Sequence, residues 1–393
     1  MQRLLVLALL AGGVLRAETV LALPFFNHTH AADLDWIGES IAETVGDSLA
    51  SGGVLILDRD DRLEGYRRLS LRPGAELTHA SIIKIGEALD ASKVVYGYYQ
   101  LQPAPAGKDR LKSSLSLTVR IIDLKHMRQG PEFSETGALE DLAALEVHLS
   151  WQVLNSLMPK TAPSEQQFLR DRPPVRIDAV ESYVRGLLTQ SAEQRHHFFT
   201  QAARLDPNYS QPCFQLGEIY WEKKDYKIAA NWFDRVKRSD SRYFEAQFFL
   251  GLSRYHMGDF DGAVQSFQTV VAEVPLNEVY NDLGAAQSRR NDTAAALANF
   301  RKAIEGDDAD PDYYFNLACT QWRADQFDAA AASFRKVLER SPNDTEAASM
   351  LELAVKREGP NPGNPPTDSR QRLKTNYEET AYRQLQAELQ SKK

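Results

Sequence analysis

A repeat of 33 or 34 residues restricts the fold of this chain more than any other feature of its sequence. Leucine recurs in one register, at Leu216, Leu250, Leu283, Leu317 and Leu351. The residue after each of the first four leucines is small: Gly217, Gly251, Gly284 and Ala318. An alanine and a phenylalanine follow with the same steps, at Ala229, Ala263, Ala296 and Ala330 and at Phe233, Phe267, Phe300 and Phe334. Columns that share one period indicate a repeated unit that stacks on its neighbours.

The residue types in these columns suit a pair of helices. A small residue allows two helices to cross closely, and an aromatic ring fills the space between one pair and the next. A pair cannot bury its apolar face alone, so several pairs must stack and the end repeats must differ from the rest. The 33-residue step lies beside Pro275 and shortens a turn there. This pattern resembles the tetratricopeptide repeat, which implies a right-handed all-α solenoid over residues 177–356, with about five repeats and a capping helix.

The resemblance also implies a concave groove, lined by the first helix of each pair. Residues at i and i+7 on these helices share one face. That face has aromatic pairs in three repeats: Phe214 with Trp221, Phe248 with Tyr255, and Phe315 with Trp322. The fourth repeat has the polar set Asn281, Ala285 and Ser288, and the face is flanked by His256, Arg289 and Arg323. We expect the groove to bind protein or peptide ligands. Alternatively, the aromatic residues pack between helices, or the N-terminal domain or the last helix fills the groove.

Residues 1–17 have the layout of a secretory signal peptide. Arg3 gives a positive start, residues 4–15 form an apolar run, and the small residue Ala17 marks the expected cleavage site. The run is shorter than the roughly 20 residues that a membrane-spanning helix needs. We therefore expect an exported, soluble protein, periplasmic or secreted, without a transmembrane span. The alternative is a buried N-terminal strand or helix.

Residues 18–160 mix strand-like and helix-like patterns. Strands are expected at 19–25, 54–57, 93–101 and 111–122, and helices at 35–50, 80–89 and 139–157. The acidic and basic run 58–62 reads as a solvated turn. Four stretches resemble the N-terminal domain of TolB: Leu23-Pro24-Phe25-Phe26-Asn27, Asp33-Leu34-Asp35-Trp36-Ile37-Gly38-Glu39-Ser40-Ile41-Ala42, Ala91-Ser92-Lys93-Val94-Val95-Tyr96-Gly97-Tyr98 and Ile121-Ile122-Asp123. The resemblance implies a mixed α/β cell-envelope module that docks against other proteins.

The remaining segments complete an α+β multidomain chain. Residues 161–176 read as a linker between the two domains because prolines stand there among charged residues. Residues 357–370 are rich in proline and glycine, which break helices and sheets, so we expect a disordered linker. Residues 371–393 are expected to contain a C-terminal helix with a short apolar stripe.

The sequence offers no pattern that favours catalysis. A net charge of −8 without a basic stripe argues against nucleic acid as a partner. The two cysteines lie three repeats apart and are expected to be free. His28 and His30 are a weak metal motif, and there is no glycine-rich phosphate loop. We therefore expect no enzyme activity, no cofactor and no metal, and a small-molecule ligand is not expected. The alternative is a ligand sensor or an envelope enzyme that uses polar residues at 27–39.

Overall fold

The computed structural model describes residues 18–103, 109–360, 371–378, 382 and 385. The expected signal peptide, residues 1–17, lies outside this part of the chain. So does most of the expected proline- and glycine-rich linker.

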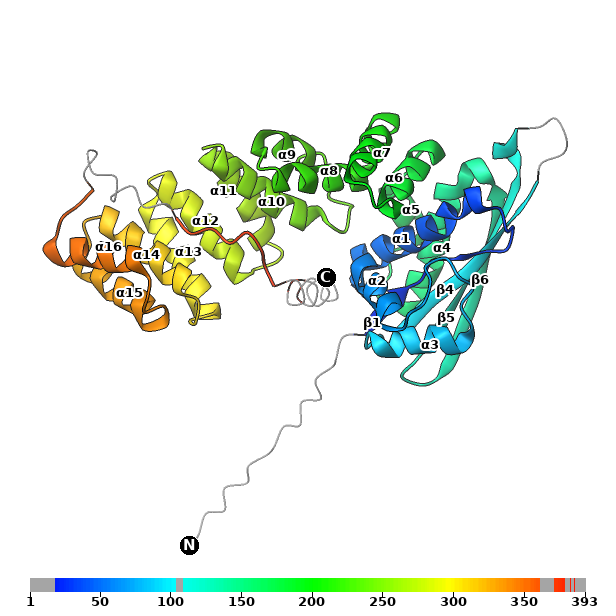
Figure 1. Cartoon of the computed structure of the whole chain (residues 1–393), viewed down its shortest axis with the longest axis horizontal. Coiled ribbons are helices and arrows are strands. Elements are labelled where there is room, and N and C mark those ends of the chain that lie inside the picture. Colours follow the sequence, from blue (N-terminus) through cyan, green and yellow to red (C-terminus); the bar gives the residue numbers. More distant parts are fainter. Residues whose placement is uncertain (1–17, 104–108, 361–370, 379–381, 383–384, 386–393) are drawn as a thin grey trace, which may run out of the picture.

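The N-terminal part is a mixed sheet covered by helices on both faces (Figure 1). Its strand order is β3-β1-β4-β5-β6, with β2 beside β4. The strands are β1 (Thr19–Ala22), β2 (Phe26–Asn27), β3 (Leu55–Leu57), β4 (Lys93–Gln102), β5 (Ser114–Asp123) and β6 (Arg128–Ala138). β1 runs parallel to β3 and β4, whereas β4, β5 and β6 are antiparallel. The sequence predicted the mixed α/β character of this part but missed β6.

Alternation along the strands creates two cores. Val20 packs on one face with α1 (Trp36–Ser51) and α4 (Leu142–Leu157). Leu21 packs on the other face with α2 (Arg59–Arg68) and α3 (His79–Ala88). Successive side chains of a strand point to opposite faces, so a short apolar strand such as β1 is buried on both sides.

The segment expected to be a solvated turn is instead the start of α2. The side chain of Asp58 accepts a hydrogen bond from the backbone of Asp61, which bonds back to the backbone of Asp58. This capping box satisfies two of the donors that a helix start leaves unpaired. Arg62 is buried and pairs with Glu39 and with Glu43, the latter at 3.1 Å. The partners that bury Arg62 lie about 20 residues earlier in the chain, on α1. The local composition of residues 58–62 therefore could not predict that this segment is a packed helix.

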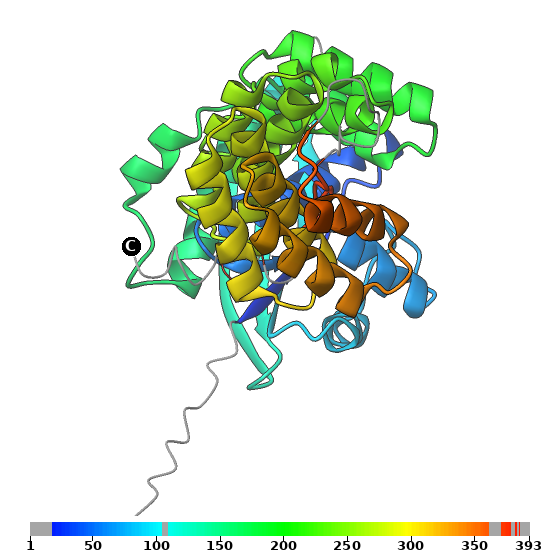
Figure 2. The same cartoon turned by 90° about the vertical axis from the view of Figure 1, so that its left-hand side faces the viewer.

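The second part is an array of antiparallel helix pairs that extends away from the sheet (Figures 1 and 2). The helices, in five pairs followed by α16, are α6 (Ile177–Leu188), α7 (Ala192–Leu205), α8 (Ser210–Glu222), α9 (Tyr226–Phe233), α10 (Tyr243–His256), α11 (Phe260–Val271), α12 (Asn277–Arg289), α13 (Thr293–Gly306), α14 (Pro311–Arg323), α15 (Phe327–Arg340) and α16 (Thr345–Lys356). At Gly251, an added Cβ would lie 2.7 Å from the ring of Phe267. The small column and the aromatic column therefore touch within one pair, which sets how closely its helices cross.

The two parts share a continuous core. One hydrophobic cluster extends from Val20 in β1 to Leu250 in α10. The segment expected to be a linker contains a short helix, α5 (Glu165–Asp171), whose Phe168 is buried in that cluster. The Asp47 carboxylate of α1 accepts a hydrogen bond from the backbone of Ser241 at 3.2 Å. These contacts join the sheet domain to the first helix pairs.

Most of the expected C-terminal helix lies outside the described residues, and the two described residues within it, Tyr382 and Leu385, are helical. Residues 371–378 come directly before it. They have no regular secondary structure and run beside α12 in Figure 1. We call this stretch the C-terminal segment. The physical reason for its extended form is that its backbone groups bond to solenoid side chains instead of to one another. Among the described helices, none is long and apolar enough to cross a membrane.

Candidate protein-binding groove

The aromatic residues expected to line the groove are largely buried. Relative exposure is 1% or less for Phe214, Phe248, Phe315 and Trp322. Trp221 and Tyr255 are half-buried, His256 is exposed, and Arg289 and Arg323 are half-buried. These residues therefore do not form the expected open aromatic surface. Phe214 lies under the guanidinium of Arg242, 3.5 Å from the ring centroid.

Part of this burial comes from the C-terminal segment. Tyr377 meets Phe248 edge to face, with ring centroids 5.3 Å apart. The guanidinium of Arg372 lies 3.5 Å from the ring centroid of Phe315. Thus the chain itself covers the expected groove face in repeats three and five, one of the alternatives that the sequence left open.

Two asparagines hold the backbone of the C-terminal segment. The Nδ2 groups of Asn281 and Asn316 donate to the carbonyl of Arg372 at 3.0 and 2.8 Å. The Oδ1 of Asn316 accepts the backbone N–H of Arg372 at 2.7 Å. Both asparagines are fully buried, and the Nδ2 of Asn316 also donates to the Oδ1 of Asn281 at 2.8 Å. Such bonds recognise a peptide backbone whatever its side chains.

In the fourth repeat, the residue equivalent to Asn316 is Asp282, and it binds the segment two residues further on, at Lys374. Asp282 and Asn316 each stand directly before a repeated leucine. Asp282 Oδ1 accepts the backbone N–H of Lys374 at 2.9 Å, as Asn316 accepts that of Arg372. Burial raises the pKa of Asp282 well above its ordinary value. The segment therefore advances two residues for one repeat, which suits an extended chain.

A cluster of carboxylates surrounds the Arg372 guanidinium. Arg372 contacts Asp344 at 2.7 and 3.0 Å, Glu346 at 3.0 Å and Asp312 at 3.3 Å. The hydrogen bonds from Arg372 hold the pKa of Asp344 below its ordinary value. Asp312 lies on α14, whereas Asp344 and Glu346 lie at the start of α16. The guanidinium thus bridges two neighbouring repeats.

Lys374 occupies an adjacent acidic site. Its Nζ lies 2.7 Å from both Asp310 and Asp312. Burial lowers the pKa of Lys374, but the hydrogen bonds to these two carboxylates outweigh that effect and raise it. Lys374 Nζ also lies 5.3 Å from the ring centroid of Tyr313.

Sequence reasoning missed the polar residues that contact the segment. It treated the fourth repeat as a polar gap, yet Asn281 binds the segment backbone and Ser288 accepts from Gln371 at 3.2 Å. A usable signal was the polar residue before the repeated leucine, Asp282 and Asn316. The acidic helix starts at residues 310–312 and 344–346 were a second signal.

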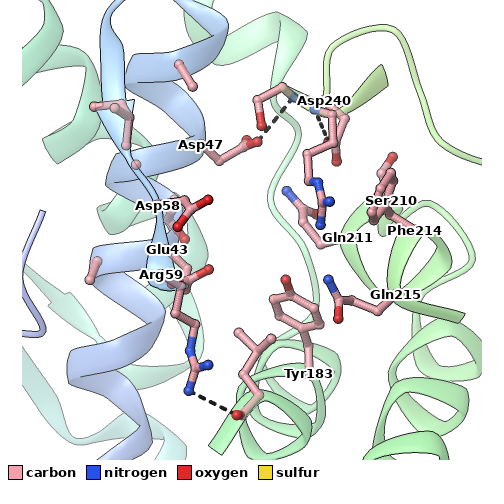
Figure 3. Close-up of a pocket in the computed structure, with 18 of the residues that line it drawn as sticks. Glu43, Asp47, Asp58, Arg59, Tyr183, Ser210, Gln211, Phe214, Gln215 and Asp240 are labelled. Atoms are coloured by element: carbon pink, nitrogen blue, oxygen red, sulfur yellow. Dashed lines mark hydrogen bonds between the residues drawn. The ribbon is translucent and has the colours of Figure 1, made fainter. Parts of the chain in front are cut away.

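A large cavity of about 1370 Å³ lies where the sheet domain meets the solenoid (Figure 3). Glu43 and Asp47 line it from α1, and Tyr183 lines it from α6. Burial raises the pKa of Asp240 to about 8 and also raises that of Asp47. Tyr377 reaches the same cavity, which therefore adjoins the end of the groove.

The sites weighed for other chemistry do not assemble within the described residues. No group of three or more His, Cys, Asp and Glu side chains there could hold a metal ion. His28 stacks on Tyr98 with ring centroids 4.5 Å apart. Cys213 and Cys319 are both buried and are not joined in a disulfide, as expected.

Comparison with known proteins identifies the repeat. A tetratricopeptide repeat family model matches residues 214–278 and 281–360. YrrB, described as a tetratricopeptide repeat protein with an unusual peptide-binding site, is 20% identical over 46% of this chain and 92% of its own, with a TM-score of 0.41. MamA from Desulfovibrio magneticus RS-1 is 24% identical over 43% of this chain and 98% of its own, with a TM-score of 0.38. No curated protein matches this chain. The two matched stretches are built of tetratricopeptide repeats, as their spacing predicted.

Proposed function

We propose that this protein is a non-enzymatic scaffold that binds an extended segment of another polypeptide in its concave groove. Tetratricopeptide repeats mediate interactions between proteins, and the groove here has the means to hold a backbone. The observation that carries the proposal is the contact of Asn281 and Asn316 with both backbone groups of Arg372.

The surroundings of these asparagines support the proposal. Both side chains are fully buried while the segment is in the groove, so their polar groups depend on the segment backbone and on each other for hydrogen bonds. Unpaired buried polar groups cost about 1–3 kcal/mol each. A groove with this chemistry is therefore stabilised by any extended chain that supplies a carbonyl and an N–H at that point.

The wider setting is part of the same proposal. We infer that the chain is exported through residues 1–17 and acts in a bacterial cell envelope. Residues 18–160 would be a second docking module similar to the N-terminal domain of TolB, and residues 177–356 the scaffold. Phe214, Trp221, Phe248, Tyr255, Phe315 and Trp322, flanked by His256, Arg289 and Arg323, would shape the partner surface.

A random peptide library tests the binding activity even though the partner is unidentified. Phage-displayed peptides are selected on a full chain that carries Arg372→Glu/Lys374→Glu, which repels its own C-terminal segment from the groove. They are then measured on the same chain with Asn281→Ala/Asn316→Ala added. We expect affinity to fall about tenfold or more, because each hydrogen bond to the peptide backbone contributes about 1 kcal/mol. The exposed Asn231 on α9 provides the matched control, and Asn231→Ala should leave affinity unchanged. Peptides that bind equally well after Asn281→Ala/Asn316→Ala would refute a role for this groove.

A further inference from the structure

We propose that the groove selects a basic extended segment, with two cationic side chains two residues apart and an aromatic side chain three residues later. We further propose that residues 371–377 are an internal copy of this ligand, which a partner must displace. The inference rests on the proposed function and adds to it the chemistry of the partner and its competitor.

The spacing of the two cations fits an extended ligand. Alternate residues of an extended chain lie on one side, about 6.5–7 Å apart. Arg372 and Lys374 are alternate residues, and both contact Asp312. The carboxylate of Asp312 thus lies between two cation sites whose separation matches the chain repeat.

Charge at these sites favours a cationic ligand. Four carboxylates (Asp310, Asp312, Asp344 and Glu346) contact the two cations that residues 371–377 supply. Asp310 and Asp344 also cap α14 and α16, which explains why acids occur at those two positions. Capping does not explain why three carboxylates converge on one guanidinium. Without a bound cation these carboxylates would repel one another, so an acidic or neutral segment would fit poorly.

Aromatic contacts complete the recognition pattern. The guanidinium of Arg372 lies over the fully buried ring of Phe315, and Tyr377 packs on Phe248 two repeats away. A guanidinium can stack on a ring and bind carboxylates at its edge together, which an ammonium does less well. We therefore expect arginine to be preferred at the first cationic position, and an aromatic residue at the third contact.

The stretch that joins α16 to the C-terminal segment determines how strongly the internal copy competes with a partner for the groove. The segment follows α16 after a short stretch rich in proline and glycine. A short tether gives an attached ligand an effective concentration of about millimolar. A free partner must overcome that concentration, and it can do so with a longer contact surface or a higher local concentration.

The test uses the full chain with Arg372→Glu/Lys374→Glu, which repels the segment from the carboxylates. The probe is a fluorescent peptide with the sequence of residues 369–379, and binding is followed by anisotropy. We expect the probe to bind the double variant at least tenfold more tightly than the unaltered chain. Added salt should weaken that binding because it screens the charges. A probe with glutamate at both cationic positions should not bind.

Controls separate release of the segment from other effects. Arg335→Glu/Lys336→Glu changes an exposed basic pair on α15 by the same charge and should leave probe binding as in the unaltered chain. Arg372→Ala/Lys374→Ala provides a second release variant if the glutamates disturb folding. Light scattering should give the mass of a monomer both for the unaltered chain and for the release variants.

Three results would overturn the inference. Equal binding of the probe to the unaltered and released chains would show that the segment does not compete. Equal binding of the reversed-charge probe would refute selection of cations. A dimer that dissociates on release would place the segment in the groove of a second copy. If library peptides still require Asn281 and Asn316 but lack basic residues, only this inference fails; if no peptide uses the groove, the proposed function fails as well.

Discussion

At the residue scale, the repeat depends on a few positions where backbone geometry is demanding. A left-handed residue separates the two helices of four successive pairs: Lys224, Gly258, Asn291 and Asp325. The next residue caps the second helix in three of them, with side chains of Asp225, Asp259 and Asp292. The left-handed column was not visible in the sequence, because four different residue types fill it. The leucine, small-residue and phenylalanine columns were visible because packing restricts them to similar side chains.

Close contact between the small and aromatic columns leads to a prediction for Gly251→Ala. The added Cβ would meet the Phe267 ring at 2.7 Å, so the ring or the helix must shift. We expect the free energy of unfolding to fall by about 1–2 kcal/mol, as for other overpacked sites. Ala318 occupies the equivalent position in the fifth repeat, so the substitution should distort the pair without unfolding it. Denaturant titration measures the change, with exposed Gln265→Ala on α11 as the control. An unchanged or higher stability would contradict this account of the helix crossing.

At the element scale, the sequence predicted most helices and strands but few of the contacts between them. Periodicity identified α1 and β4 within a residue or two of their observed bounds. It missed α2, whose Arg62 is buried by partners on α1. It gave no sign that residues 371–376 are extended in the groove, because the groove residues that bind their backbone are about 60–90 positions away along the chain. Long-range contacts of this kind leave no local periodic signal.

The junction between α1 and the turn before α10 leads to a pH-dependent prediction. Asp240 is buried near Asp47, and its pKa is raised to about 8, mainly by burial. An aspartate in the unfolded chain has a pKa of about 3.9. The folded state therefore binds more protons between these values, and stability falls as the pH rises from about 4 to about 8. Asp240→Asn keeps the Oδ1 that accepts from the Arg242 backbone but cannot ionise.

We expect Asp240→Asn to flatten this decline and to raise the free energy of unfolding at pH 8 by about 1 kcal/mol or more. Chemical denaturation at pH 5, 6.5 and 8 measures it. Asp308→Asn, at an exposed carboxylate, is the control and should retain the slope of the unaltered chain. A slope that stays unchanged in Asp240→Asn would show that Asp240 is ionised in the folded protein.

At the scale of the whole molecule, the chain consists of a sheet domain, a helical repeat array and the C-terminal segment that lies in the groove of that array. The shared core links the sheet to the first helix pairs, while the C-terminal segment spans the later ones. The sequence indicated a groove and left its occupant open. The structure adds a segment in the groove whose backbone bonds to two neighbouring repeats. The contacts of that segment show which groove residues can bind a backbone and which can bind a cation.

Hydrogen exchange of residues 371–378 tests the central claim most directly. The N–H of Arg372 donates to Asn316 and that of Lys374 to Asp282. Amides with such partners exchange only when the contact opens. In the unaltered chain, we predict that a fragment covering these residues exchanges at least tenfold more slowly than an unstructured peptide of the same sequence. In Arg372→Glu/Lys374→Glu it should exchange at the unstructured rate. Exchange at the unstructured rate in the unaltered chain would contradict the account, because the segment would then not occupy the groove.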